Sequence, residues 1–129
     1  MVYFFVGFGG MAGSLLRYLL SILAVHFWGN EFPIGTLFIN LTGSFFLGWM
    51  TTAWVIPKKL HPYLLSALTT GVIGSYTTFS TFCYESVHLF ETKEYLFGFL
   101  YMFISLIGGL FFVRAGRKIS ERQKKGEVL

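Results

Sequence analysis

Charged residues are scarce in this sequence. Only 12% of its 129 residues are Asp, Glu, Lys or Arg, whereas 54% are hydrophobic and 20% are aromatic. A typical soluble domain carries about 25% charged residues, because its surface faces water. Half of that share is too little to cover a soluble globule of this length, which argues against a cytosolic enzyme. The length allows one domain.

Cysteine is almost absent as well. Cys83 is the only cysteine, which excludes an intrachain disulfide and a metal site built from cysteines. The three histidines, His26, His61 and His88, are scattered along the chain without the spacing of metal ligands. Neither residue type therefore indicates a metal site.

Long stretches without any Asp, Glu, Lys or Arg take up most of the chain. They cover residues 32–57, 60–84 and 95–113, which are 26, 25 and 19 residues long. A helix needs about 20 mainly apolar residues to cross a membrane. The sequence therefore predicts an integral membrane protein. Its spans are expected to be helices, because backbone groups in lipid must be hydrogen-bonded internally.

Four helices are predicted, and clusters of turn-forming and charged residues separate them. The predicted helices of this all-α membrane protein cover residues 2–27, 34–56, 62–90 and 95–115. Together they form one transmembrane domain, residues 1–115, and residues 116–129 form a basic cytoplasmic tail.

The basic residues predict an orientation. With four spans, both termini and the loop between the second and third helices share one side of the membrane. That side holds Lys58, Lys59 and the six basic residues between Arg114 and Lys125, whereas the opposite side holds only Lys93. Positive charges favour the cytoplasmic side, so the termini are predicted to be cytoplasmic. A basic tail beside so much apolar sequence indicates a membrane-surface anchor rather than a site for nucleic acid.

Four helices enclose little volume, so a transport path is expected to need a second subunit. Gly9 and Gly13, and likewise Gly71 and Ser75, form small-xxx-small pairs that let helix backbones approach closely. These pairs are equally compatible with packing between subunits and with packing among the four helices of one chain.

Two ionisable residues fall inside predicted spans, where charge is costly and points to function. Arg17 lies in the second half of the first helix, and Glu85 lies in the third. Arg17 either reaches the membrane interface, pairs with an acid, or sets the electrostatics of an anion path. If it pairs with an acid, Glu85 is the obvious internal partner.

Polar residues at helical spacing follow two of the predicted helices. The second helix carries Thr36, Asn40, Gly43 and Ser44, and the fourth carries Tyr101, Ser105 and Gly109. Hydroxyl groups in helices often bond only to their own backbone, so each residue alone means little. Two such stripes, which include an amide and a phenol, predict a lined polar path.

The third helix contains a run that a continuous helix accommodates poorly. Five Ser or Thr residues and Tyr76 fall within residues 75–82. Their hydroxyls compete for backbone hydrogen bonds and the β-branched residues are stiff, so we expect a broken helix. Freed carbonyls can then hold a cation, and the start of the second half-helix can attract an anion. The electropositive ring edges of Phe79 and Phe82 can contact a small anion, although both rings can also face lipid or the core.

These motifs resemble the CrcB/Fluc family, small four-helix fluoride channels of the bacterial plasma membrane, over about residues 4–115. Three stretches carry the resemblance, namely Gly9–Tyr18, Gly35–Asn40 and above all Gly71–Phe82. The specific part is Thr-Thr-Phe-Ser-Thr-Phe inside a glycine-flanked membrane span.

The resemblance implies a dimer of two antiparallel subunits with two fluoride pores. It implies a structural Na⁺ at the centre of the dimer, which is not transported and is held by the backbone carbonyls of Gly74 and Thr77 of both subunits. The residues implied along the fluoride path are Asn40, Phe79, Ser80, Thr81, Phe82, Tyr101 and Ser105. Glu85 is implied near a pore mouth, and Arg17 takes the position of the family's arginine in the first helix.

Two positions depart from the family's pattern. Ser75 stands where many relatives have a second glycine, and Gly109 stands where a serine is common in the fourth helix. The charge asymmetry also conflicts with an antiparallel homodimer, in which one sequence must insert both ways. We hypothesise that the partner is a related chain with the opposite charge bias, and a homodimer remains the alternative.

The predicted function is passive export of cytoplasmic fluoride, which lowers its toxic concentration. Passive export needs no ATP site and no catalytic residue, so we expect the protein not to be an enzyme. A proton-coupled small multidrug exporter also has four helices, but it needs an acid in the first helix, where this chain has Arg17 instead. A third interpretation is a non-conducting subunit of a heterodimeric fluoride channel, for which the two departures leave room.

Overall fold

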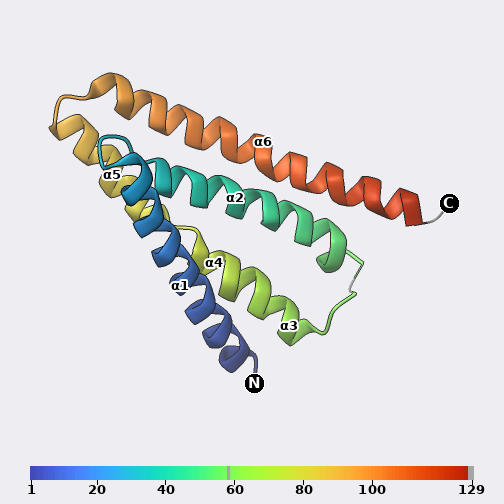
Figure 1. Ribbon diagram of the computed structural model, residues 1–129. Helices are drawn as coiled ribbons and strands as arrows, with labels where there is room; N and C mark the ends of the chain where they lie inside the picture. Colours follow the sequence, from blue (N-terminus) through green and yellow to red (C-terminus); the bar gives the residue numbers. More distant parts are fainter. Residues whose placement is uncertain (58, 128–129) are drawn as a thin grey trace.

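The computed structural model describes residues 1–57 and 59–127, and over these residues the chain is helical without any strand. The first long helix, α1, covers Val2–Trp28. The second, α2, covers Ile34–Met50 and continues into a π-helical turn, η1, at Thr51–Val55. The last, α6, covers Tyr95–Glu127. Together with the segment between them, these helices confirm the prediction of an all-α chain with four helical segments (Figure 1).

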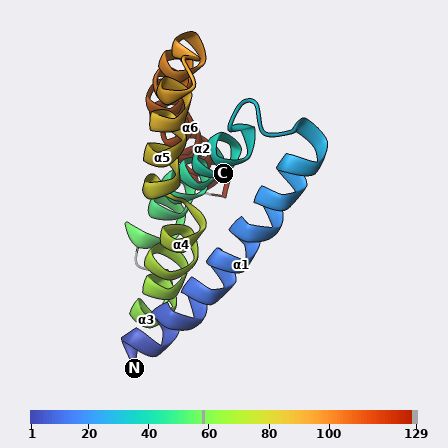
Figure 2. The same cartoon turned by 90° about the vertical axis from the view of Figure 1, so that its left-hand side faces the viewer.

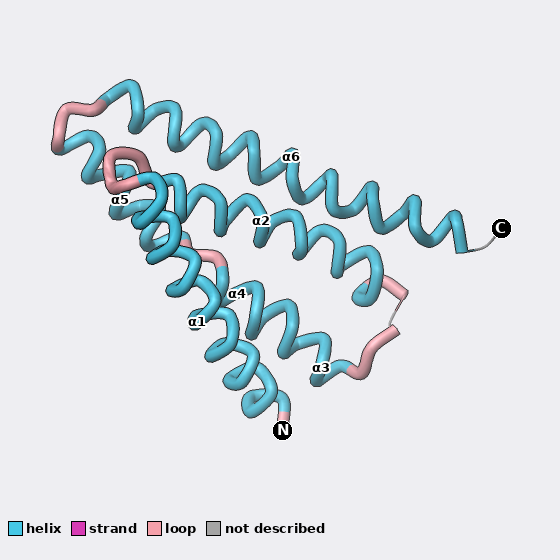
Figure 3. Tube along the Cα trace, in the orientation of Figure 1, coloured by secondary structure: helices cyan, strands magenta, loops and turns pink. Residues whose placement is uncertain are grey.

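The third segment is divided, as the Ser/Thr run predicts. Its first half consists of α3 (Pro62–Ser66), the π-helical stretch η2 (Ala67–Ile73) and α4 (Gly74–Tyr76), and its second half is α5 (Phe79–Glu91). Figure 3 shows the short non-helical link between α4 and α5. The break, at Thr77 and Thr78, therefore falls inside the run and directly precedes Phe79.

Three helices of the described residues are long and apolar enough to cross a membrane: Val2–Trp28, Ile34–Val55 and Tyr95–Gly126. The third predicted span is not among them because its helix is interrupted. An interruption of this kind is tolerated at membrane depth only where protein or a water-filled cavity surrounds the freed backbone groups.

Helices α2 and α6 lie side by side along most of their length (Figures 1 and 2). Two glycines allow this close approach. A Cβ atom on Gly48 would overlap the carbonyl of Val113, and one on Gly116 would overlap the carbonyl of Phe45. Small residues at such crossings are the usual means by which membrane helices pack without a hydrophobic driving force.

Helix α1 crosses the first half of the third segment through the predicted glycine pair. A Cβ atom on Gly9 would overlap the carbonyl of Ala67, and one on Gly13 would overlap that of Val72. Figure 2 shows the amino-terminal half of α1 against α3 and α4, while its other half diverges from the bundle. The pair thus packs within the chain. Ser75 also faces α1, because a Cβ on Gly10 would lie 3.2 Å from its Oγ.

Most large apolar side chains are exposed. Tyr101 and Ile39 are among the few large side chains that are fully buried, at 0% and 1% exposure. Exposed rings and aliphatic chains instead cover α1, α5 and α6. Such a surface is compatible with lipid or a second subunit and not with water.

Helix α6 does not stop at residue 115 but continues to Glu127. Residues after Arg114 are mainly good helix formers, and Arg117 and Glu121 form an i, i+4 ion pair with 3.9 Å between their nearest charged atoms. Charge alone does not end a helix, and residues 116–127 of the stretch predicted as a tail extend the fourth helix; residues 128–129 lie outside the described residues.

Candidate functional site

The break in the third segment is two residues long and extended. Thr77 has ψ 157°, and Thr78 has φ −146° and ψ 119°. Thr78 is the N-cap of α5, since its Oγ1 accepts a hydrogen bond from the Thr81 amide at 3.2 Å. Threonine is a favoured N-cap because its side-chain oxygen replaces a missing backbone acceptor.

The side chain of Asn40, from α2, pairs with the backbone of Thr78. Its Nδ2 donates to the Thr78 carbonyl at 3.0 Å, and its Oδ1 accepts from the Thr78 amide at 2.9 Å. One amide side chain therefore satisfies both the N–H and the carbonyl of Thr78. Buried backbone groups need such partners, most of all in lipid.

The break leaves the carbonyls of Gly74 and Thr77 without the amides that would bind them in a continuous helix. In a continuous helix the Gly74 carbonyl would accept from the Thr78 amide, which here donates to Asn40. The Thr77 carbonyl would accept from the Thr81 amide, which here donates to the Thr78 hydroxyl. The break thus leaves the four carbonyls from Gly74 to Thr77 without helical partners, and the two that the resemblance implies as Na⁺ ligands are among them.

A groove of about 290 Å³ lies beside the break. Its lining comes from α2 and from both sides of the interruption: Asn40, Gly43, Ser44, Leu47, Thr69, Ile73, Gly74, Thr77, Thr78 and Phe79. Gly43 allows α2 to lie this close, because a Cβ there would overlap the Thr77 methyl group. Asn40, Gly74, Thr77 and Phe79 are therefore brought together in one place.

Hydroxyl groups connect this groove with a second, larger cleft. The Thr78 hydroxyl donates to the Thr81 hydroxyl at 2.9 Å, and Thr81 lines a cleft of about 840 Å³ that also contains Thr36 and Glu85. Ser80 is exposed, with its Oγ 3.4 Å from that of Thr78. The polar side chains form a continuous line from the groove at the break to the cleft.

Aromatic rings follow the same direction along α5. The ring centres of Phe79 and Phe82 lie 5.9 Å apart with an angle of 33° between their planes. Phe82 also lies 5.2 Å from the ring of Tyr101 on α6. Phe79 is 77% exposed, so most of its surface is available to another chain or to an ion path.

Glu85 lies at the centre of a small hydrogen-bonded cluster. Its Oε1 accepts from the Thr36 hydroxyl at 2.8 Å, and its Oε2 accepts from the Tyr101 hydroxyl at 2.7 Å. The cluster joins α2, α5 and α6 at one wall of the larger cleft. Hydrogen bonds to a carboxylate are among the stronger ones in proteins, and this cluster therefore fixes the three helices relative to one another.

The model of the family described as CrcB-like protein, Camphor Resistance (CrcB), matches residues 4–117. The chain belongs to this family. A relative named Fluoride-specific ion channel FluC 2, from Geobacillus kaustophilus, is 43% identical over 125 residues, which cover 97% of each chain. Two relatives named Fluoride-specific ion channel FluC 1 are also similar. That of Bacillus cereus is 44% identical over 85% of this chain and 76% of its own, and that of Staphylococcus aureus, strain RF122, is 40% identical over 92% and 96%.

Membership of the CrcB-like family confirms the resemblance found in the sequence, and with it the expectation that the chain is not an enzyme. A single chain brings together only some of the residues predicted for the ion path. Asn40 and Phe79 line the groove and Thr81 lines the cleft. The other four predicted path residues line neither, namely Ser80, Phe82, Tyr101 and Ser105.

The suggested ion pair between Arg17 and Glu85 does not form among the described residues. Both Glu85 oxygens accept hydrogen bonds from hydroxyl groups, and Arg17 is half-buried on α1. Whether two helices bring their charges together depends on the rotation of each helix about its axis, which the positions in the sequence do not give.

Sequence reasoning also missed one contact next to the break. The hydroxyls of Thr42 on α2 and Tyr76 on α4 are hydrogen-bonded at 2.9 Å, and Tyr76 is buried. A buried tyrosine usually finds a partner for its hydroxyl, so a tyrosine within the Ser/Thr run was the feature of the sequence that could have indicated such a contact. In this CrcB-like chain, Asn40 and Thr42 hold the two sides of the break against the same helix.

Proposed function

We propose that this chain forms a fluoride-selective channel that exports cytoplasmic fluoride passively. The observation that carries the proposal is the broken third helix, held by Asn40 beside Phe79, in a chain whose relatives are named fluoride-specific ion channels. A break beside an open groove, with an amide, hydroxyls and phenyl rings around it, has the chemistry that a small anion needs.

Fluoride is strongly hydrated, so a selective path must replace its water at close range. The Asn40 amide has two N–H groups, of which one donates to the Thr78 carbonyl. The other is free to donate to an anion in the groove. The hydroxyls of Ser80 and Thr81 and the ring edges of Phe79 and Phe82 continue the path towards the cleft at Glu85 and Tyr101.

The driving force is the electrochemical gradient. Hydrogen fluoride enters a cell as a neutral weak acid and ionises at cytoplasmic pH, which traps fluoride. The inside-negative membrane potential then moves the anion outwards through an open path. Export needs neither ATP nor a coupled ion.

The working channel is proposed to be a dimer of opposite orientations. Exposure of Phe79, Ser80 and Gly74 and the open groove support this, since one chain supplies only part of a wall. The eight basic residues on the side of the termini, against Lys93 alone on the other, favour a related partner of opposite bias over a homodimer. The same asymmetry supports cytoplasmic termini in the plasma membrane of a bacterium.

A structural Na⁺ is proposed at the break. The carbonyls of Gly74 and Thr77, which lack their helical partners, are hard oxygen ligands of the kind that alkali cations accept. Two carbonyls are too few for one cation, so the same pair from a second subunit would complete the site. The cation would hold the two breaks together and compensate the carbonyl dipoles.

Two other functions are less well supported. A proton-coupled multidrug exporter needs an acid in its first helix. Helix α1 of this chain has none, and Arg17 would repel a cationic drug. A non-conducting subunit is compatible with Gly109, which leaves a gap where a serine is common. A Cβ at that position would lie 3.8 Å from the Ser44 hydroxyl, which is an ordinary contact. Glycine in place of serine therefore removes a hydroxyl beside Ser44 but places nothing in the path.

The test is fluoride efflux from vesicles, recorded with a fluoride electrode under a potassium gradient with valinomycin. The chain is reconstituted alone and after co-expression with an oppositely biased relative. We expect flux in at least one arrangement, and its loss in Phe79→Ile and Asn40→Asp. Phe103→Ile is the matched control, because Phe103 is also exposed, at 64%, but lies on the outward face of α6. No fluoride flux in either arrangement would overturn the proposal.

A further inference from the structure

The outward face of α6 changes from apolar to basic part-way along the helix. Exposed apolar residues recur on this face every three or four positions: Leu96, Leu100, Phe103, Ile107 and Phe111. The next positions of the same series are Arg114, Lys118, Arg122 and Lys125, which are all exposed. Residues at this spacing share one helix face. One continuous surface is therefore apolar along its first part and mainly basic along its second, where the exposed Glu121 also lies on it.

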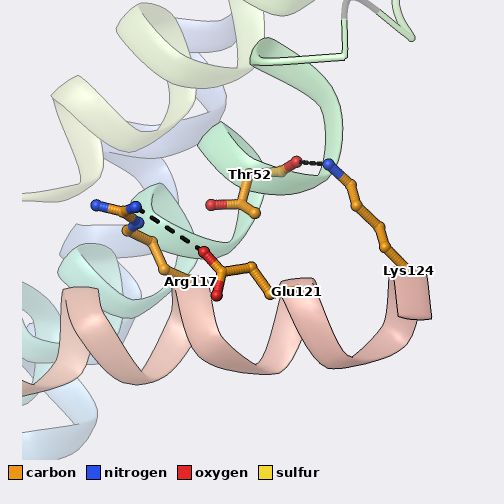
Figure 4. A network of polar contacts seen from close by, with 4 residues as sticks. All are labelled: Thr52, Arg117, Glu121 and Lys124. Carbon is orange, nitrogen blue, oxygen red and sulfur yellow. Dashed lines mark hydrogen bonds and ion pairs between the residues drawn. The ribbon is translucent and has the colours of Figure 1, made fainter. Parts of the chain in front are cut away.

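The opposite face of the same segment is fixed to the rest of the chain. Gly116 lies against the Phe45 carbonyl, and Gln123 accepts a hydrogen bond at 3.0 Å from the Trp49 indole. Lys124 donates to the Thr52 carbonyl in η1, as Figure 4 shows. The end of α6 is thus a rigid continuation of the helix and not a loose tail.

The length of α6 places the change of character at a membrane surface. Its 33 residues span about 50 Å, whereas the hydrocarbon core of a bilayer is about 30 Å thick. The apolar stretch 95–113 fills most of that core. On the neighbouring helix, the rings of Trp49 and Trp54 lie 5.0 Å apart, and paired tryptophans of this kind are typical of the interface. The basic residues follow at the depth of the lipid headgroups.

We propose that Arg114, Lys118, Arg122 and Lys125 form a basic stripe that binds the headgroups of anionic phospholipids. The apolar part of the same face contacts the acyl chains, and the stripe then meets phosphate groups without any change in the helix. Arg117 lies at the edge of the stripe, with its charge partly matched by Glu121 (Figure 4). This inference does not depend on the proposed fluoride function.

The position of the basic stripe favours binding of lipid headgroups over binding of an anion on its way to the channel. Ser105 is half-buried on the side of α6 opposite to the stripe, and Tyr101 is buried with its hydroxyl bonded to Glu85. The stripe therefore faces away from the path that those residues are predicted to line. Surface charges on a membrane act within about a Debye length, roughly 8–10 Å. Arg114 and Lys118 are consequently expected to contribute most, and Arg122 and Lys125 less.

The experiment measures phospholipid binding to the full-length chain in detergent by mass spectrometry of the intact complex. Phosphatidylglycerol and phosphatidylcholine are titrated separately. For R114Q and K118Q we expect the affinity for phosphatidylglycerol to fall about five-fold each, with a smaller fall for R122Q and K125Q. The variant with all four changes should lose its preference for phosphatidylglycerol over phosphatidylcholine.

K93Q is the matched control, because it removes one positive charge from the other end of the bundle. The exchange R114K with K118R keeps both charges and should keep the affinity. Single changes of these exposed residues remain informative if the fourfold variant does not fold. Equal losses in K93Q, or unchanged phosphatidylglycerol affinity in R114Q and K118Q, would overturn the inference. So would a lower fluoride flux of K118Q in vesicles of phosphatidylcholine alone, since the stripe would then act on the ion.

Discussion

Asn40 binds, with one side chain, both backbone polar groups of Thr78 at the point where the third helix is broken. The amide nitrogen donates to the Thr78 carbonyl at 3.0 Å, and the amide oxygen accepts from the Thr78 N–H at 2.9 Å. An extended peptide in lipid would otherwise carry two unsatisfied groups, at a cost of several kcal/mol. The residue implied as a ligand of the anion is therefore also the support of the break.

The first prediction concerns this support. Asn40→Ala removes both partners of Thr78, so we expect the free energy of unfolding to fall by about 2 kcal/mol or more. Flux should be lost as well, because the break no longer has a fixed shape. Thermal unfolding in detergent and fluoride efflux check the two effects. Ser44→Ala is the matched control, since Ser44 lies one turn later and donates only to the Asn40 carbonyl. Equal stability of the two variants would contradict the prediction.

The second prediction concerns the N-cap of α5. Thr78→Ala leaves the Thr81 amide without its acceptor, which should lower the unfolding free energy by about 1 kcal/mol. Thr78→Ser keeps the hydroxyl oxygen and should retain most of the stability. The two variants are compared by thermal unfolding under identical conditions. If serine and alanine were equally destabilising, the threonine methyl group and not the cap would be responsible.

How far the sequence predicts this molecule depends on the kind of interaction. Long apolar runs predict helices well, because lipid leaves the backbone no alternative. The break was predictable too, since the hydroxyls between Ser75 and Thr81 compete locally with the helix. What Thr78 pairs with was not, because Asn40 lies 38 residues earlier on another helix. Its amide was predicted from the polar stripe of the second helix and from the resemblance, but only as a group that lines the ion path.

Two further differences between the prediction and the structure also arise from contacts between helices. The predicted end of the fourth helix at residue 115 rested on the appearance of charges, but the docked face with Gly116 and Lys124 keeps the helix intact. The suggested partner of Glu85 was Arg17, yet hydroxyls from α2 and α6 take both oxygens. Tertiary packing decides each case, and neither contact has a signal within its own segment.

The third prediction concerns the crossing of α1 with the third segment. A methyl group at Gly13 would overlap the Val72 carbonyl, which is backbone and cannot move aside cheaply. Gly13→Ala is expected to lower the unfolding free energy by about 1–3 kcal/mol. Gly7→Ala is the control on the same helix, because nothing lies within 4 Å of the added atom, and it should be neutral or slightly stabilising. Thermal unfolding in detergent compares the two; equal effects would mean that α1 does not cross at Gly13.

The last prediction concerns the cluster around Glu85. Tyr101→Phe keeps the ring beside Phe82 but removes the hydroxyl that donates to Glu85, so one carboxylate oxygen loses its partner. We expect a loss of about 1.5–3 kcal/mol in unfolding free energy, as for other hydrogen bonds to charged groups. Because the two residues act as a pair, the double variant with Glu85→Gln should lose less than the sum of the single losses, with a coupling of at least about 0.5 kcal/mol. Tyr84→Phe serves as the control, since Tyr84 is 72% exposed on the same helix as Glu85. Strictly additive losses would show that the carboxylate does not depend on the phenol, and that the contact between α5 and α6 rests on the rings alone.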